Sequence, residues 1–282
     1  MIAQKQILLY WGGKNNSDMI SLIISFYKHL DFLELIFQSL DKQSYKNFEV
    51  IIAEDNNDPQ TVEFINKARL IHTYSIQHVS HEDIGFRKTR ILNTAVKTAK
   101  GDQIVFIDGD CILQKHFMKE YSIAITDSHF CYGRRVFCSK KHTDMLLKSG
   151  SIKKVNIILA ILHGGKSIGA GFYLPFKKNI DKQHRRILGC NWGILKKNIL
   201  AVNGFDEDYI RAGVGEDFDI DWRLKKQGLK VRSVKGKAIV FHLYHEANYN
   251  PSDTEFVEKL MAEKKIIGKS FCVNGINKEQ FL

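Results

Sequence analysis

The chain has 282 residues, 44% of them apolar and 11% aromatic, and a formal net charge of +11. This composition supports a well-buried core and excludes disorder as the default state. Five cysteines, an odd number without Cys-x-x-Cys spacing, argue against a disulfide framework and a structural zinc site. The charge implies an anionic partner, namely nucleic acid, acidic lipid or a phosphorylated substrate, and does not choose among them.

The sequence predicts neither a membrane span nor a leader. The longest apolar runs, such as 157–162, are far shorter than the roughly 20 residues that cross a bilayer. The first six residues lack the basic and apolar regions of a signal peptide. We therefore expect a cytoplasmic protein.

The first half of the chain alternates between strand-like and helix-like segments. The apolar run 21–26 predicts a buried strand, and apolar side chains recurring at helical spacing over 33–40 predict a helix. A second strand is expected over 48–53. Asp58-Pro59 then supplies a cap and a first-turn proline for the next helix.

The same alternation continues to the middle of the chain. A third strand is expected over 74–79, and Gly85-Phe86-Arg87 leads into a helix whose apolar face spans 92–99. The next strand, 104–107, ends in Asp108-Gly109-Asp110. A βαβα rhythm implies a parallel sheet with ligands at the carboxyl ends of its strands.

Asp108-Gly109-Asp110 is typical of a site that presents a divalent cation to a phosphate. A diphosphate and two carboxylates repel one another, and a hard cation with oxygen ligands can hold both. Asp and Gly are also the residues that an ordinary strand-ending turn prefers. The pair by itself leaves both interpretations open.

The second half begins with a basic stretch, 140–186, in which lysines and arginines alternate with apolar runs. Such a mixture suits the surface of an anionic membrane. A solvated basic face over ordinary core residues is the commoner explanation of such a stretch.

Several short motifs follow the basic stretch. A helix is expected over 196–202 and another from Gly213 to Lys226. A strand over 238–241 delivers His242-Leu243-Tyr244-His245, and 246–282 are expected to form one polar helix and a tail.

The order of these motifs resembles the GT-A-fold glycosyltransferases, specifically the inverting family 2 enzymes with a galactosyltransferase-like C-terminal segment. The resemblance covers roughly residues 20–245 and rests on 21–28, 49–57, 108–110, 189–191, 203–207, 213–219 and 242–245. Two features depart from the pattern. Ser25 and Phe26 replace the usual proline and threonine, and Gly213 replaces a tryptophan that many relatives use against the acceptor sugar.

The resemblance implies an α/β fold with a mostly parallel central sheet flanked by helices. Residues 1–115 would form the nucleotide-sugar-binding half and 116–245 the acceptor-binding and catalytic half of the same domain, followed by the C-terminal helix and tail, 246–282. The donor would be held by Tyr27, Asp55, Arg87, Asn93, Asp108 and Asp110. Mn2+ or Mg2+ would be bound by Asp110, Asp108 and His242, with His245 as the second choice.

The chemistry expected from the resemblance is inverting transfer. Asp217 is the expected base, because it lies at a predicted helix N-terminus, where the dipole favours the ionised carboxylate. Glu216 would orient the acceptor, and Asn191 and Trp192 would line its pocket. The cation would stabilise the departing diphosphate.

The expected substrates are a UDP-hexose or UDP-N-acetylhexosamine and a glycan or lipid-linked saccharide, as in bacterial surface polysaccharide synthesis. Peripheral contact with the inner face of an anionic membrane is part of this hypothesis; binding of nucleic acid is not. Two alternatives are a phosphatase of the haloacid dehalogenase type and a basic nucleic-acid-binding module. In such a phosphatase the βαβ segment follows the paired aspartates instead of preceding them. Nucleic-acid binding calls for exposed aromatics, whereas these lie at core periodicities.

Overall fold

The computed structural model describes residues 18–213, 215–246 and 251–278. Residues 1–17 of the expected nucleotide-sugar half and residue 214 of the 213–219 motif lie outside these ranges. The strands are β1 (Ile20–Phe26), β2 (Phe48–Glu54), β3 (Ser75–Ser80), β4 (Gln103–Asp108), β5 (Cys111–Leu113), β6 (His129–Tyr132), β7 (Arg134–Phe137), β8 (Ile180–Asp181), β9 (Trp192–Leu195), β10 (Lys230–Ser233) and β11 (Ile239–His242). The α-helices are α1 (Leu30–Asp41), α2 (Pro59–Ile71), α3 (Lys88–Thr98), α4 (Phe117–Ala124), α5 (Lys140–Ser149), α6 (Ile157–Leu162), α7 (Lys196–Leu200), α8 (Gly215–Lys226) and α9 (Pro251–Ile267).

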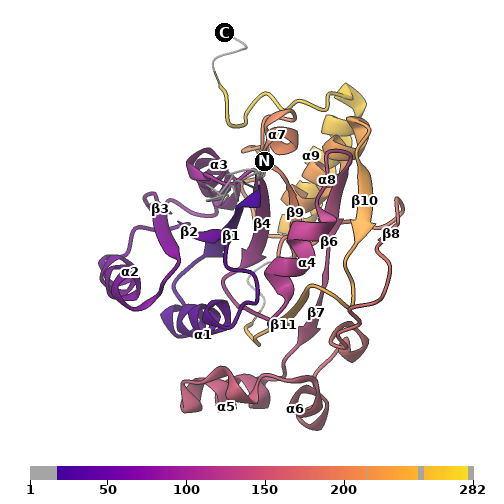
Figure 1. The fold of residues 1–282 in the computed structure, drawn as a ribbon. Coiled ribbons are helices and arrows are strands. Elements are labelled where there is room, and N and C mark those ends of the chain that lie inside the picture. The colour runs from indigo at the N-terminus through magenta and orange to yellow at the C-terminus, as the bar shows by residue number, and fades with distance from the viewer. Residues whose placement is uncertain (1–17, 214, 247–250, 279–282) are drawn as a thin grey trace, which may run out of the picture.

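One large sheet runs through both halves of the chain in the order β3-β2-β1-β4-β9-β6-β10-β8 (Figure 1). The first four strands are parallel, which confirms the expected α/β fold. β9 then pairs antiparallel with both β4 and β6 and so joins the halves. A smaller sheet, β5-β11-β7, lies beside it.

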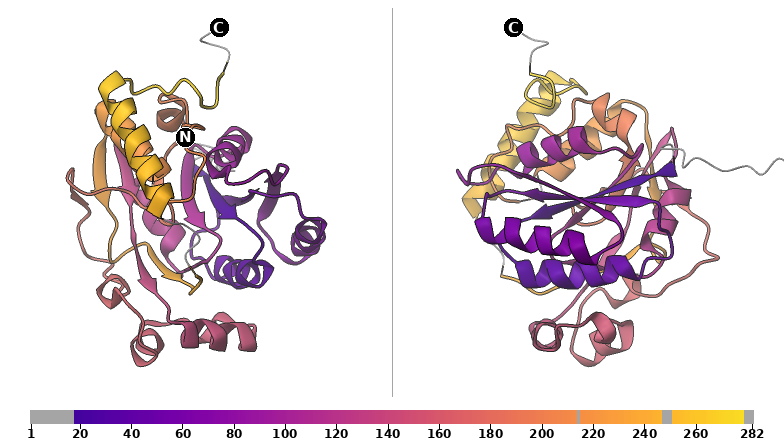
Figure 2. Two further views of the ribbon diagram at one scale, coloured as in Figure 1. Left: turned by 180° about the vertical axis from the view of Figure 1, so that it is seen from behind. Right: turned by 60° about the vertical axis from the view of Figure 1, so that its left-hand side comes forward.

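Helices cover both faces of the large sheet (Figure 2). Along β1, Leu22 and Ile24 pack with α1, α2 and α4, while Ile23 packs with α3, α7 and α8 on the other face. This alternation is the period of two that a strand buried on both faces requires. Asp58 caps α2 as expected, since its carboxylate accepts a hydrogen bond from the backbone N–H of Gln60 (2.9 Å).

A third apolar cluster lies under the smaller sheet, where β7 and β11 pack against α5, α6 and one edge of α1. Helices α5 and α6, which belong to the basic stretch 140–186, project from the sheet region (Figure 1). Within the described ranges, no helix is long and apolar enough to cross a membrane.

The strand register brings the candidate donor residues to one edge. Phe26 of β1 pairs with Glu54 of β2, and Ser25 pairs with Asp108 of β4. The residues that follow these strands therefore leave the sheet together, at its carboxyl edge.

Candidate active site

A cavity of about 490 Å³ opens at this carboxyl edge, between the ends of β1 and β4 and helix α5. Its walls include Tyr27, Asp108, Asp110, Thr143 and His245. Gly109 allows the two aspartates to approach the end of β1. A Cβ atom at this position would lie 3.0 Å from the backbone oxygen of Ser25, so the turn favours glycine.

Asp110 lies between two histidines. Its Oδ2 atom is 2.9 Å from Nε2 of His245 and 3.4 Å from Nε2 of His242. Burial raises the pKa of Asp110, but the hydrogen bond from His245 and both imidazoles outweigh it, so this pKa lies below its ordinary value. The same hydrogen bond raises the pKa of His245 to about 9. Burial lowers the pKa of His242, which keeps that imidazole neutral.

The residues around Asp110 fit a divalent cation. Ligand atoms of Asp110, Cys111 and His242 all lie within 4.8 Å of one another. A carboxylate and a neutral imidazole are ligands that Mn2+ accepts. Burial raises the pKa of the Cys111 thiol well above its ordinary value, so this sulfur stays protonated and is a poor ligand.

Asp108 is held by a lysine that the sequence analysis missed. Nζ of Lys88, the first residue of α3, is 3.1 Å from Asp108 and 3.4 Å from Glu216. Burial lowers the pKa of Lys88, but Asp108, Glu216 and Asp217 together raise it well above its ordinary value. Lys88 therefore stays charged and joins the carboxylates of β4 to those of α8.

A signal for Lys88 was present in the sequence. A cation in the first turn of a helix opposes the helix dipole, and α3 has no acidic residue there to offset it. A lysine in such a position indicates that acidic groups from elsewhere in the fold balance its charge.

Asp55 is fixed from two sides. It accepts hydrogen bonds from Nε2 of His81 (2.6 Å) and from the backbone N–H of Arg87 (2.9 Å). The Arg87 guanidinium itself turns to the carbonyl of Phe86. Tyr27 is 44% exposed and donates its hydroxyl to Asp83 (3.1 Å). His81, for which the sequence suggested no role, is a direct partner of Asp55.

Asp217 is buried in the first turn of α8. Its Oδ2 atom accepts a hydrogen bond from the backbone N–H of Gly189 (2.6 Å), and a Cβ atom at Gly189 would lie only 2.8 Å from its Oδ1. Burial, followed by the charge of Glu216, raises the pKa of Asp217 to about 7. This corrects the expectation that the helix dipole favours the ionised form, because desolvation outweighs the dipole.

Glu216 is also buried, and burial raises its pKa against the opposing charge of Lys88. Its Oε2 atom has no hydrogen-bond partner among the described residues. A buried carboxylate oxygen without a partner is costly, and a sugar hydroxyl is a donor that would satisfy it.

Three side chains that were expected to contact a ligand are buried and have partners within the protein. The amide of Asn93 bonds the backbone N–H and C=O of Phe205 and thereby holds the 203–207 turn. Asn191, 0% exposed, bonds Tyr121 and two backbone carbonyls. Trp192, 1% exposed, stacks on Phe106 at 4.4 Å. The contacts of these three side chains in this structure are therefore with the protein itself, and their expected contacts with ligands stay predictions.

Comparison with known proteins identifies the family. The profile described as Glycosyl transferase family 2 matches residues 21–185, more than half of the chain. The chain belongs to glycosyl transferase family 2. A second profile, described as N-terminal domain of galactosyltransferase, matches residues 173–246 of this family 2 chain.

Curated relatives are similar over much of this family 2 chain and are longer. The chondroitin synthase of Escherichia coli is 24% identical over 272 residues, which cover 86% of this chain and 39% of the synthase. The poly(ribitol-phosphate) beta-N-acetylglucosaminyltransferase TarS of Staphylococcus aureus strain Mu50 is 27% identical over 111 residues, 39% of this chain and 19% of TarS. The chain thus spans less than half the length of these relatives.

Solved structures share the fold. S. aureus TarS 1-349 in complex with UDP superposes with a TM-score of 0.60 at 17% identity, covering 89% of this chain and 66% of that one. GalNAc-T7 with UDP, GalNAc and Mn2+ gives a TM-score of 0.63 at 14% identity, covering 87% of this chain and 47% of that one. The family 2 chain therefore has the GT-A fold.

Proposed function

We propose that this family 2 chain transfers a hexose or N-acetylhexosamine from a UDP-sugar to a hydroxyl of a glycan or lipid-linked saccharide, with inversion at the anomeric carbon. The observation that carries the proposal is the charged cluster centred on Lys88, which links Asp108 at the end of β4 to Glu216 and neighbouring Asp217 on α8. Transfer between a donor and an acceptor needs Asp108, on the donor side, next to the acidic pair of α8, on the acceptor side.

The relatives support this assignment of the donor. The TarS structure contains UDP, a second one contains UDP-GlcNAc, and the GalNAc-T7 structure contains UDP and GalNAc. In this chain the nucleoside would lie against Tyr27 and Asp55, with Arg87 at its edge. The diphosphate would then extend toward Asp108 and Asp110 in the cavity at the carboxyl edge.

Asp110 and His242 are the proposed ligands of a divalent cation, with His245 beside them. Mn2+ fits this oxygen and imidazole set and is present in the GalNAc-T7 structure. When bound, such a cation neutralises charge on the departing diphosphate as a Lewis acid. Lys88 adds a second, permanent positive charge next to Asp108.

Asp217 is the proposed base. The acceptor oxygen forms a bond to the anomeric carbon, its proton passes to the Asp217 carboxylate, and the bond from carbon to the diphosphate oxygen breaks, releasing UDP. A pKa of about 7 suits this task, because a base is most effective when its pKa lies near the working pH. The unpartnered Oε2 atom of Glu216 would hold a hydroxyl of the acceptor.

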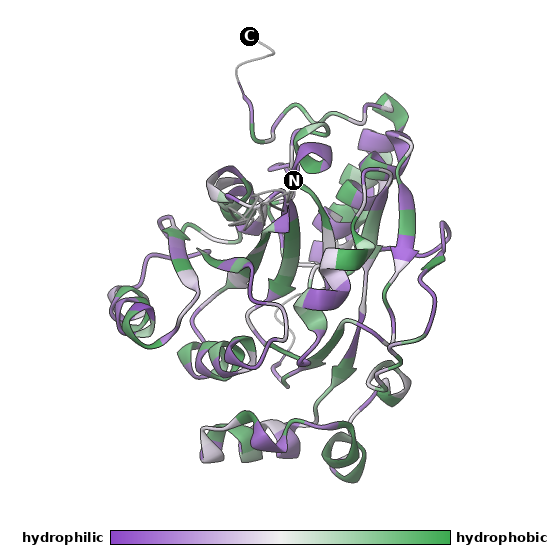
Figure 3. Cartoon of the chain, viewed as in Figure 1, coloured by the Kyte–Doolittle hydropathy of each residue, from purple (hydrophilic) through white to green (hydrophobic). Residues whose placement is uncertain are grey.

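The surface next to the smaller sheet supports contact with an anionic membrane. On α6, Ile158, Ile161 and Leu162 are exposed, and Figure 3 shows this helix as largely hydrophobic. Lys153 and Lys154 precede it in the chain. Apolar groups beside lysines are the combination that binds anionic lipid headgroups.

The membrane part is tested by sedimentation with vesicles. We expect the protein to sediment with phosphatidylglycerol vesicles and not with phosphatidylcholine, and to lose this on Ile158→Ser with Leu162→Ser. Equal sedimentation of the variant and the parent would remove the membrane from the proposal.

The transfer reaction is tested by a thermal-shift panel of nucleoside diphosphates, with and without Mn2+, followed by UDP release from UDP-sugars. We expect a UDP shift that depends on the cation, and slow donor hydrolysis. Absence of that shift would contradict the proposal. Phosphate release from simple monoesters would instead support a phosphatase.

A further inference from the structure

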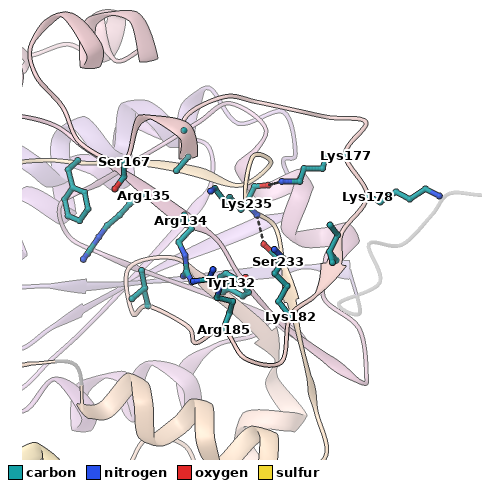
Figure 4. A pocket seen from close by; sticks show the side chains of 15 residues that line it. Tyr132, Arg134, Arg135, Ser167, Lys177, Lys178, Lys182, Arg185, Ser233 and Lys235 are labelled. Carbon is teal, nitrogen blue, oxygen red and sulfur yellow. Dashed lines mark hydrogen bonds between the residues drawn. The ribbon is translucent and has the colours of Figure 1, made fainter.

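A second cavity, of about 440 Å³, lies between β7, the short 3-10 helix Ile168–Ala170 and the segment 177–185 (Figure 4). Its lining is strongly basic and includes no acidic side chain. The cations are Arg134, Arg135, Lys177, Lys178, Lys182, Arg185 and Lys235.

These seven cations, four exposed and three half-buried, form no ion pair with any carboxylate among the described residues, unlike several cations elsewhere in the chain. Arg223 pairs with Asp219 at 2.7 Å, and Lys264 pairs with Asp206 at 2.8 Å. In the basic pocket, the contacts go to neutral atoms: Lys177 Nζ donates to the carbonyl of Lys235 (3.3 Å) and Arg134 to that of Arg186 (3.3 Å).

The pocket therefore gathers several positive charges without ion-pair partners among the described residues. Burial lowers the pKa of Arg135, but nearby groups that include Asp108 and Asp110 raise it above its ordinary value. The Nε atom of Arg135 is buried with no hydrogen-bond acceptor among the described residues. Burial lowers the pKa of Arg134, and the positive charge of Arg185 acts in the same direction. A concave surface with one sign of charge concentrates ligands of the other sign.

The pocket lies next to the proposed catalytic centre, because Arg135 is close enough to Asp108 and Asp110 for their charges to raise its pKa. Leu188 lines it, and the next residue, Gly189, holds Asp217. The Arg135 guanidinium lies 4.5 Å from the ring of Phe137. That ring is 5.4 Å from the ring of His242, with which Phe137 pairs in register. A ligand in the pocket would thus be separated by one side chain from His242 and by one residue from the segment that holds Asp217.

We propose that this basic pocket binds phosphate groups of the acceptor, next to the sugar that receives the transferred residue. The inference rests on the proposed function and narrows its acceptor to a phosphorylated one: a lipid-linked saccharide diphosphate or a glycan with phosphodiesters. Seven cations call for several negative charges within a small volume. Arginine forks match phosphate oxygens in pairs, whereas a single carboxylate would leave most of the charge unmatched.

The experiment compares two charge-matched variants of the full chain. The pocket variant carries Lys182→Gln, Arg185→Gln and Lys235→Gln; the control carries Lys42→Gln, Lys100→Gln and Lys119→Gln, which are exposed and outside the pocket. Calorimetric titration in saturating UDP and Mn2+ measures four probes: a glycerol-phosphate oligomer, a short-chain prenyl-diphosphate N-acetylglucosamine, a uronic-acid tetrasaccharide and a neutral tetrasaccharide.

We expect at least one phosphorylated probe to bind, with affinity reduced about tenfold or more in the pocket variant and nearly unchanged in the control. The phosphorylated probe that binds more tightly identifies the source as polymer or lipid. Equal losses in both variants, or tighter binding of the uronic-acid or neutral probe, would overturn the assignment.

The UDP thermal shift separates this inference from the proposed function. In one outcome the pocket variant keeps the Mn2+-dependent UDP shift while the parent binds phosphorylated probes no better than the neutral probe. That result contradicts the inference about the pocket and leaves the proposed function intact. Loss of the UDP shift in the parent protein sinks the proposed function instead.

Discussion

The charges of the proposed catalytic centre and of the basic pocket are organised in opposite ways. At the proposed catalytic centre each carboxylate has at least one partner in place: Lys88 for Asp108 and Glu216, the two histidines for Asp110, and the Gly189 N–H for Asp217. In the basic pocket the seven cations form no ion pair with a carboxylate of the described residues. A centre that performs chemistry holds its charges rigidly before substrate arrives, whereas a site that recognises a charged ligand leaves its own charges for the ligand to match.

Removing the base gives the largest expected effect on the catalytic side. Asp217→Asn should lower kcat about 10³-fold, because the amide cannot take the acceptor proton. The UDP affinity should change little, since Asp217 is not one of the proposed donor ligands. Single-turnover transfer and UDP titration measure the two quantities; a variant that retains normal kcat would assign the base elsewhere.

Removing the shared cation comes next. Lys88→Met should lower kcat/KM about 100-fold and the free energy of unfolding by about 3 kcal/mol, because it leaves buried carboxylates uncompensated. It should also move the pH profile upward, since Lys88 lowers the pKa of Asp217. Lys88→Arg is the matched control and should recover most of both losses. Pre-steady-state rates and urea unfolding measure them; an unshifted profile in Lys88→Met would contradict the electrostatic role.

The pH dependence follows from the pKa of about 7 at Asp217, against an ordinary 3.8. The base must be ionised, so kcat/KM should rise about tenfold per pH unit below pH 7 and level off above it. Stability runs the other way. A carboxyl group whose pKa is raised in the folded state stabilises the fold fully at pH values below its pKa in the unfolded chain. This contribution is lost as the pH rises through about 7.

The stability half can be checked with the base variant. At pH 8, Asp217→Asn should be about 1–3 kcal/mol more stable than the parent, and at pH 4 the difference should vanish. Urea unfolding at both pH values decides this, and a variant less stable than the parent at pH 8 would show that the buried carboxylate is not strained.

The smallest expected effect on activity lies at the boundary between the two regions. Trp192→Phe should cost about 2 kcal/mol of stability, because it leaves a gap against Phe106. Its kcat/KM should stay within about twofold of the parent, since the indole is buried away from ligands. A large rise in the acceptor KM alone would restore Trp192 to the acceptor site.

The positions that the sequence predicted best are those at the ends of strands. Apolar runs at β1, β2 and β4, alternating with helical segments, predicted the parallel sheet, and the end of β4 placed Asp108 and Asp110 at its edge. Lys88 and His81 escaped because their partners are distant in the chain and the contacts exist only after folding. The burial of Asn191 and Trp192 was not predicted, because it depends on the insertion of β9 between β4 and β6, which are distant from it in the chain.

Side chains of strand β7 connect the basic pocket with the proposed cation site. Arg135 lies against Phe137 on this strand, and Phe137 lies against His242. Coupling between two ligands is reciprocal, so any gain in cation affinity that an anion at Arg135 produces must return as an equal gain in anion affinity. If ligands in the two cavities are coupled through this strand, an affinity measured for one of them depends on the occupancy of the other, and both must be stated together.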